Sequence, residues 1–397
     1  GKDVVSIDDV TVADWNEEEI DGGVAEEVTP TIDLSKYTDG ETVNIAEDCR
    51  VIGDGNEYNL TLNVTDDAKV TFAAGASGVK LAAPITVADG KTLTLTIRDN
   101  VEHIVNGGIS LGNGSNVIIE GERNKENNKL TVTGTDGNAG IGANNGVTAG
   151  DITIRNAHVE ATGSSTSDES IDLVCGAGIG TSNGSMGNIL IENSIIVAEG
   201  GYYEYETPAP AIGMGEKNGI MGDITIVDSE ITATNNGEGF ASVIGAIDND
   251  GIGTMGDIVI TNCELNLTMV ITEADWYGAF IGPGLGGSST QFNMGKIIFT
   301  ELTEGKKKEI MINQYGMPDI VEFTYTGSAI SAPDFVGKAP QAVVDWGDGI
   351  TEGYYMSSPE HSYEHPGEYV VNVAVRESNG FTIEKMTGIS VLDLSNY

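Results

Sequence analysis

The stretch that decides the fold opens with Gly140-Ile141-Gly142, followed ten residues later by Gly150-Asp151-Ile152. Both phrases then recur four times before residue 300. The first returns as Gly178-Ile179-Gly180, Ala211-Ile212-Gly213, Val243-Ile244-Gly245 and Phe280-Ile281-Gly282. The second returns as Gly187-Asn188-Ile189, Gly222-Asp223-Ile224, Gly256-Asp257-Ile258 and Gly295-Lys296-Ile297. Successive Ile-Gly phrases are 38, 33, 32 and 37 residues apart. A period in the thirties indicates a solenoid or another array of repeated units.

Apolar and polar residues alternate after each Gly-polar-Ile phrase. In the first unit Ile152 and Ile154 come before Asn156, and Val159 and Ala161 come after it. A period of two indicates strands with one buried face. The residue between the two strands is Asn or Asp in four units: Asn156, Asn193, Asp228 and Asn262. The chain must turn there, and Asn tolerates left-handed backbone angles. Each unit is therefore expected to form a strand, a sharp bend, a second strand, a loop and a short Ile-Gly strand.

One such unit cannot bury its apolar face alone, but stacked units can, by parallel pairing of equivalent strands at about 5 Å per layer. This pattern resembles the right-handed parallel β-helix, the fold of pectate lyase and of many surface adhesins, in which such an Asn ladder recurs. A propeller with blades of roughly 40–50 residues is the alternative. It needs four strands per unit, and the pattern contains three. For Asn193 and Asn262 we expect inward side chains that bond backbone groups of neighbouring coils.

Composition divides the chain into three parts. Residues 1–30 carry many acidic groups and little periodicity, which indicates a flexible acidic tether. The β-helix is expected over 31–308, because strand signals such as Leu93-Thr94-Leu95-Thr96-Ile97 continue upstream of the clear repeats. Terminal coils of a solenoid are atypical because they cap an open edge. A separate β-sandwich is expected over 309–397.

The basis for that sandwich is Trp346-Gly347-Asp348-Gly349, followed by His361-Ser362-Tyr363 and then Pro366-Gly367-Glu368-Tyr369. This series resembles the PKD domain, an immunoglobulin-like β-sandwich that mostly serves as a spacer or binding module on exported proteins. Val344 stands where the family has Trp, and Trp346 stands where it has Phe. Gly-Asp-Gly is also a hairpin-turn signal in its own right, and an alternating strand follows Tyr369.

The formal net charge of −42 restricts the possible partners. Nucleic-acid binding needs a basic stripe, and the 19 Lys and Arg residues are spread over 397 positions. Polyanionic glycans and anionic membranes are also disfavoured as partners, because the acidic surface would repel them. No apolar run is long enough to span a membrane, so direct membrane insertion by this chain is not expected. An acidic, soluble surface fits an extracellular protein on a bacterial cell surface, with its anchor outside this chain.

Enzymatic activity is left open, with a non-enzymatic role favoured. A lyase-like site on a β-helix would need clustered Asp together with a converging Lys or Arg. A hydrolase-like site would need paired Asp with a nearby His. The basic residues Arg155, Lys217 and Lys296 fall at different repeat positions, and His158 lacks such neighbours. No cofactor is expected. Calcium is possible at Asp248 and Asp250, which resemble the start of a Ca²⁺ loop whose later ligands are missing.

The candidate binding site lies on the long excursions between each second strand and the next Ile-Gly phrase. Because the units stack, these loops must emerge on one side. Their aromatic and acidic residues are Tyr202, Tyr203, Glu204, Tyr205, Phe240, Asp275, Trp276 and Tyr277. Aromatic faces can stack on sugar rings, and carboxylates accept bonds from sugar hydroxyls. The same aromatics could instead cover the side of the solenoid. The sequence thus predicts an adhesin or glycan-binding module for a neutral polysaccharide or a host-matrix surface, with a polysaccharide-cleaving enzyme and a structural stalk as alternatives.

Overall fold

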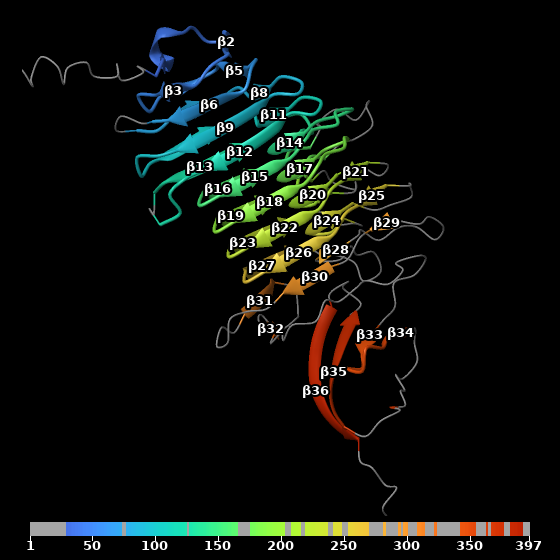
Figure 1. Ribbon diagram of the computed structural model, residues 1–397. Helices are drawn as coiled ribbons and strands as arrows, with labels where there is room; N and C mark the ends of the chain where they lie inside the picture. Colours follow the sequence, from blue (N-terminus) through green and yellow to red (C-terminus); the bar gives the residue numbers. More distant parts are fainter. Residues whose placement is uncertain are drawn as a thin grey trace, which may run out of the picture.

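The computed structural model shows an all-β chain in which most strands stack in parallel. It describes residues 29–73, 77–124, 127–165, 175–202, 208–215, 219–236, 241–247, 253–269, 281–282, 293–294, 297–300, 308–313, 321–323, 342–354, 363, 367–376 and 382–391. Within these ranges the one helix is a short 3₁₀ turn, η2 (Leu34–Lys36). The strands form three long sheets and two small ones. Figure 1 shows that the strands within these sheets follow one another in sequence order along the stack.

Each coil contributes one strand to each long sheet. Sheet 1 contains β1 (Thr31–Asp33), β3 (Cys49–Ile52), β6 (Ala68–Phe72), β9 (Thr92–Ile97), β12 (Asn116–Glu120), β15 (Ile152–Arg155), β18 (Ile189–Glu192), β22 (Ile224–Val227), β26 (Ile258–Thr261) and β30 (Ile297–Thr300). Sheet 2 contains β4 (Glu57–Tyr58), β7 (Lys80–Leu81), β10 (Glu102–Val105), β13 (Lys129–Thr133), β16 (His158–Thr162), β19 (Ile195–Glu199), β23 (Glu230–Asn235), β27 (Glu264–Met269), β31 (Lys308–Asn313) and β32 (Val321–Phe323). Sheet 3 contains β2 (Thr42–Ile45), β5 (Thr61–Val64), β8 (Ile85–Val87), β11 (Ile109–Leu111), β14 (Ile141–Ala143), β17 (Ile179–Thr181), β20 (Ile212–Met214), β24 (Ile244–Ala246) and β28 (Ile281–Gly282).

The register of these sheets explains why the repeat fades near the N-terminus. In the clear repeats Ile152 pairs with Ile189, 37 residues further along. In the first coils Cys49 pairs with Val70, only 21 residues further along, and the pairing is again parallel. The early coils therefore have the same architecture with shorter connections. The all-β parallel solenoid is consistent with the β-helix that the sequence predicts.

The core consists of columns of aliphatic side chains that point into the coil. The first strand of each repeat contributes a fully buried isoleucine: Ile152, Ile189, Ile224 and Ile258. A separate column of buried methionines runs along sheet 4, which contains β21 (Ile220–Met221), β25 (Thr254–Met255) and β29 (Asn293–Met294). Met186 pairs with Met221, which in turn pairs with Met255. Each buried aliphatic side chain contributes roughly 1.5–3 kcal/mol through removal from water.

The glycines of the Ile-Gly phrase are required by the spacing between coils. Gly213 has φ of 141°, and a Cβ there would lie 1.8 Å from the carbonyl oxygen of Gly245 in the next coil. Gly142, Gly180 and Gly245 have φ values between 138° and 145° and face the same backbone contact. This backbone region is almost closed to other residues. The repeated phrase is therefore a column of glycines whose backbones lie against one another.

The Gly-polar-Ile phrase forms a second column, on the outer surface where each coil enters sheet 1. The Oδ1 atom of Asp151 accepts a hydrogen bond from the backbone N–H of Asn188, at 2.7 Å. The Oδ1 atoms of Asn116, Asn188 and Asp223 accept equivalent bonds from the next coil at 2.7–2.8 Å. The glycine before the polar residue leaves room for this contact. A Cβ at Gly187, for example, would lie 2.2 Å from Oδ1 of Asp151.

The two ends of the stack are closed differently. At the N-terminal end the side chain of Leu34, in η2, is fully buried against the core. At the other end β31 pairs in parallel with β27 and in antiparallel fashion with β32. β31 thus belongs to the same sheet as the second strands of the coils. The antiparallel return ends the run of parallel pairing.

The small C-terminal sheet is antiparallel and contains β34 (Thr351–Tyr354), β33 (Ala342–Asp345), β35 (Gly367–Arg376) and β36 (Thr382–Val391), in that spatial order. The predicted hairpin turn joins β33 to β34, with φ of 77° at Gly347 and 91° at Gly349. Trp346 is buried. Tyr363 donates a hydrogen bond to the carbonyl oxygen of Trp346, at 3.0 Å, and stacks on Tyr369 with ring centroids 4.1 Å apart.

Candidate functional site

Candidate functional residues lie at two of the corners where the chain passes from one long sheet to the next. The corner between sheets 1 and 2 is the sharp bend that contains the Asn/Asp column. The corner between sheets 2 and 3 carries the long loops in which the sequence placed the binding residues. At the bend, side-chain hydrogen bonds hold consecutive coils in register.

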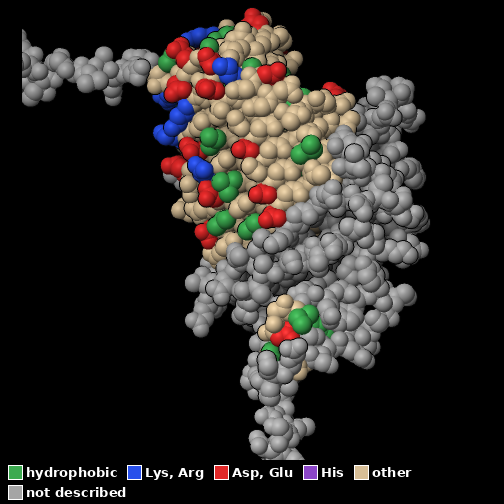
Figure 2. All heavy atoms as spheres, turned by 45° about the vertical axis from the view of Figure 1, so that its right-hand side comes forward, with side chains coloured by type: hydrophobic (Ala, Val, Ile, Leu, Met, Phe, Trp, Pro, Cys, Tyr) green, Lys and Arg blue, Asp and Glu red, His purple; other side chains and the backbone are tan. Residues whose placement is uncertain are grey.

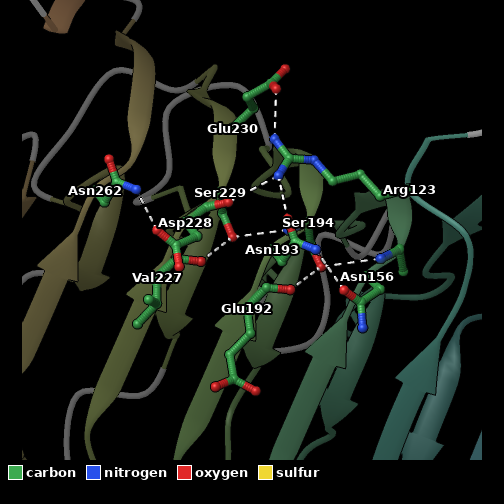
Figure 3. Close-up of polar contacts among 11 residues, drawn as sticks. Arg123, Asn156, Glu192, Asn193, Ser194, Val227, Asp228, Ser229, Glu230 and Asn262 are labelled. Carbon is green, nitrogen blue, oxygen red and sulfur yellow. Dashed lines mark hydrogen bonds and ion pairs between the residues drawn. The ribbon is translucent and has the colours of Figure 1, made fainter. Parts of the chain in front are cut away.

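The four bend residues lie in a left-handed conformation and in one row. Asn156, Asn193, Asp228 and Asn262 have φ values of 50°, 44°, 51° and 50°. Asn193 donates through Nδ2 to Oδ1 of Asn156 at 2.6 Å, and Asn262 donates in the same way to Asp228 (Figure 3). The row of polar side chains therefore exists, and its members bond one another.

The inward orientation expected for Asn193 and Asn262 is wrong for Asn193. The side chain of Asn193 is exposed and that of Asn262 is half-buried. The inward position belongs to the next residue, which is Ser194 in one coil and Ser229 in the following one, both buried. The Ser229 hydroxyl accepts from the backbone N–H of Ser194 at 3.1 Å and donates to the carbonyl of Val227 at 2.7 Å. A small residue is needed at this position because its side chain points into the coil directly after the bend, where there is little room.

Arg123 reinforces this row from a preceding coil. It lies between β12 and β13, and its guanidinium lies over the bends of the later coils in Figure 3. It donates to Oδ1 of Asn193 at 2.7 Å, to the carbonyl of Asp228 at 3.0 Å and to Glu230 at 2.6 Å. This role could not be predicted from the sequence, because Arg123 lies in the part where the repeat is degenerate. We read it as a structural contact, since all three partners belong to the scaffold.

We expect Asn193→Ala to destabilise the chain by about 1–2 kcal/mol, because alanine pays the left-handed strain that asparagine tolerates. Asn193→Gly is the matched control, because glycine adopts this conformation freely but also lacks the amide. Chemical denaturation monitored by circular dichroism would compare the two. If glycine were as damaging as alanine, the bonds of the amide to Asn156 and Arg123 would matter more than the backbone conformation.

The loop corner is built from stems that pack directly on one another. Ser164 donates through its backbone N–H to Asn138, and Gly176 donates to Ser164, at 3.1 and 2.8 Å. In the next coil Gly201 donates to Gly176 at 2.8 Å, and Ala209 donates to Gly201 at 3.0 Å. The described stems of two consecutive loops are thus joined in one chain of backbone hydrogen bonds.

Glycine permits this close packing of stems. A Cβ at Gly176 would lie 2.1 Å from the carbonyl oxygen of Asn138, and one at Gly201 would lie 2.3 Å from that of Ser164. In the third loop the buried side chain of Asn235 donates to the carbonyl of Ala241 at 3.0 Å and so joins the two ends of its loop. The expectation that these loops emerge on one side agrees with their stems, which are rigidly held at one corner.

Of the predicted binding residues, only Tyr202 lies within the described residues, where it is half-buried at the base of its loop. The remaining residues lie outside the described part of the chain: Tyr203, Glu204, Tyr205, Phe240, Asp275, Trp276 and Tyr277. The structure therefore brings the loop stems together and leaves the predicted contact residues untested. The possible calcium ligands Asp248 and Asp250 also lie outside the described residues.

Charged side chains on the outer face of sheet 2 form a network between coils. Nζ of Lys129 lies 2.9 Å from Oε1 of Glu102 and 3.0 Å from Oε2 of Glu160. The hydrogen bond from Lys129 holds the pKa of Glu102 below its usual value. His158 starts β16 nearby, and its pKa is lowered mainly by burial, so the ring is neutral at pH 7. These partly exposed pairs each contribute roughly 0.2–1 kcal/mol and hold neighbouring strands together.

The described residues hold no metal-binding cluster. No three His, Cys, Asp or Glu side chains in the described ranges come close enough to share a metal ion. Cys49, Cys175 and Cys263 are buried and form no disulfide, and burial raises the pKa of Cys49 to about 11. On the face in Figure 2, Lys and Arg side chains lie beside acidic ones, and hydrophobic side chains are scattered. In the part of the chain that the structure describes, no helix has the length and apolarity to cross a membrane.

Comparisons of the chain with protein-family models, with curated proteins and with solved structures find no match.

Proposed function

We propose that this chain is a non-enzymatic binding module of a bacterial cell-surface protein, acting as an adhesin or glycan-binding domain. The loops at the corner between sheets 2 and 3 would bind a neutral polysaccharide or a host-matrix surface. The observation that supports this proposal is the chain of hydrogen bonds from Ser164 through Gly176 and Gly201 to Ala209, which holds successive loop stems side by side. Loops on a rigid scaffold are where binding residues usually lie.

The chemistry of the loops supports a neutral, hydroxyl-rich ligand. Their tyrosine and tryptophan rings are suited to stacking on sugar rings, and neighbouring carboxylates can accept hydrogen bonds from hydroxyls. A net charge of −42 disfavours uronic acids and sulfated glycans. Because coils are about 5 Å apart, the bases of the Tyr202 and Trp276 loops, two coils apart, would be separated by about 10 Å, a span of about two sugar rings.

We further propose that the solenoid is a right-handed β-helix and that the C-terminal sheet is part of a PKD-like sandwich, which would act as a spacer. Buried Trp346 and its contact with Tyr363 are consistent with that family's pattern of a core aromatic followed by His-x-Tyr.

A screen of the purified chain against neutral, uronic and sulfated glycans and against matrix proteins tests the proposal. We expect binding to one or more neutral glycans or to a matrix protein, without turnover. Turnover of a polysaccharide would show that the chain is an enzyme instead. Failure to bind any ligand in the screen would favour a structural stalk and contradict the proposed binding role.

A further inference from the structure

His103 occupies a position where the neighbouring coils carry aliphatic residues. It lies on β10 and pairs with Leu130 of the next coil. The same inward column continues through Val159, Ile196, Ile231 and Leu265. The His103 side chain is fully buried, and the aliphatic residues of the column are fully or almost fully buried. A histidine inside an aliphatic column therefore introduces a group that can gain charge within the core of the N-terminal coils.

Two backbone contacts fix the protonation state of the ring. Nδ1 accepts a hydrogen bond from the backbone N–H of Val79, at 3.1 Å. Nε2 lies 3.2 Å from the carbonyl oxygen of Arg98, so this nitrogen must carry the proton. A second proton would have to bind Nδ1, where it would face the N–H of Val79. Protonation thus breaks a contact that joins two consecutive coils and leaves two donors opposed.

The surroundings offer little to stabilise an imidazolium. The nearest ring is Phe72 of β6, with its centroid 5.5 Å away. Burial lowers the pKa of His103, while the Arg98 carbonyl and the charge of Asp99 raise it by less. Lys80 on β7 and Glu102 on β10 flank the site at alternate strand positions that face outward. No charged side chain among these elements projects into the column beside the ring.

We propose that His103 is an acid-sensitive switch that keeps the N-terminal coils closed at neutral pH and loosens them when the ring is protonated. The direction of the pH effect on stability follows from the difference in pKa between the folded and unfolded ring. The unfolded ring titrates near 6.5, and the folded ring titrates lower, so the neutral ring stabilises the closed coils fully above that pH. This stabilisation is lost as the pH falls below about 6.5 toward the folded value.

The test is hydrogen exchange of the full chain at pH 7.5 and 5.0, corrected for intrinsic rates. In the wild type the 77–105 segment should open more at pH 5.0, by up to about thirtyfold for an unfolded pKa of 6.5. The 189–199 coil, which contains no histidine, is the internal reference. Carboxylate titration elsewhere in the chain would affect that reference as well.

Two variants separate titration from packing. His103→Leu restores the residue found in the next coil, and His103→Asn keeps an acceptor for Val79 without a titrating ring. Both should remove the extra opening of the 77–105 segment at pH 5.0, even if the leucine variant is less stable at both pH values. The proposal is overturned if the wild-type segment stays equally protected at pH 5.0. It is equally overturned if both variants lose as much protection on acidification as the wild type.

Discussion

Gly213→Ala should destabilise the solenoid by about 3 kcal/mol or more. Gly213 has φ of 141°, and the new Cβ would lie 1.8 Å from the carbonyl oxygen of Gly245. That backbone conformation alone would destabilise an alanine by about 1–3 kcal/mol. The contact with the next coil adds to this, because the opposing atom belongs to the backbone and cannot rotate away. Urea denaturation monitored by far-ultraviolet circular dichroism would measure the change.

Gly146→Ala is the matched control for this substitution. Gly146 also has positive φ, 74°, but nothing lies within 4 Å of a Cβ built there. Alanine at this site should cost about 1–2 kcal/mol, from the left-handed conformation alone. The difference between the two variants isolates the contact between coils. Equal destabilisation at both sites would show that the glycine column is not held at the spacing described.

Trp276→Ala should weaken binding of the ligand found in the screen by about 5- to 150-fold. Removal of one stacked ring costs on the order of 1–3 kcal/mol, judged by the area that a ring buries. Isothermal titration at equal ionic strength would measure the affinity. Trp276→Phe should retain much of it, because phenylalanine keeps an apolar aromatic face. The melting curve should change little if the ring stands outside the core.

Ile220→Ala is the control, because it removes an exposed hydrophobic side chain at a different corner of the coil. Ile220 is 64% exposed on β21, in the connection between sheets 3 and 1, and should have no part in binding at the loop corner. Equal affinity in wild type and Trp276→Ala would remove this loop from the site. A drop of many degrees in the melting temperature of Trp276→Ala would show that the ring packs against the solenoid instead.

The repeat predicted the architecture because each feature of a coil has a local signal. Alternation identified the strands, and the asparagine between them identified the left-handed bend. The phrase containing Gly213 identified the short third strand of each unit. The sequence also located one corner for all the long loops, because stacked units must place equivalent segments above one another.

Other features depend on contacts between coils and leave no local signal. The outward direction of Asn193 follows from which residue of the bend enters the core, and that place is taken by Ser194. Arg123 reaches Asn193 and Asp228 across about 70 and 105 residues of sequence. His103 looks like an ordinary polar residue of an alternating strand until its register with Leu130 is known. The repeat predicts the pairing of equivalent residues from Ile152 onward, but in the degenerate coils before it the sequence pattern does not specify the register on its own.

The most direct test of the parallel stack is a cysteine cross-link between Val197 and Thr232. These residues pair in register on β19 and β23, with Val197 exposed on the outer face of sheet 2. Parallel neighbours lie about 5 Å apart, within the range that a disulfide spans. The control pairs cysteines at Val197 and Asn266, one coil further along, where the separation is about 10 Å and a disulfide cannot form.

Mass spectrometry of peptides after mild oxidation would identify the cross-link without interference from the buried native cysteines. The stacked solenoid predicts a disulfide in Val197→Cys/Thr232→Cys and none in Val197→Cys/Asn266→Cys. In a propeller, equivalent residues of successive units would lie on separate blades, too far apart for either bond. Absence of the first cross-link, or formation of the second instead, would contradict the stack of coils on which the proposed binding corner depends.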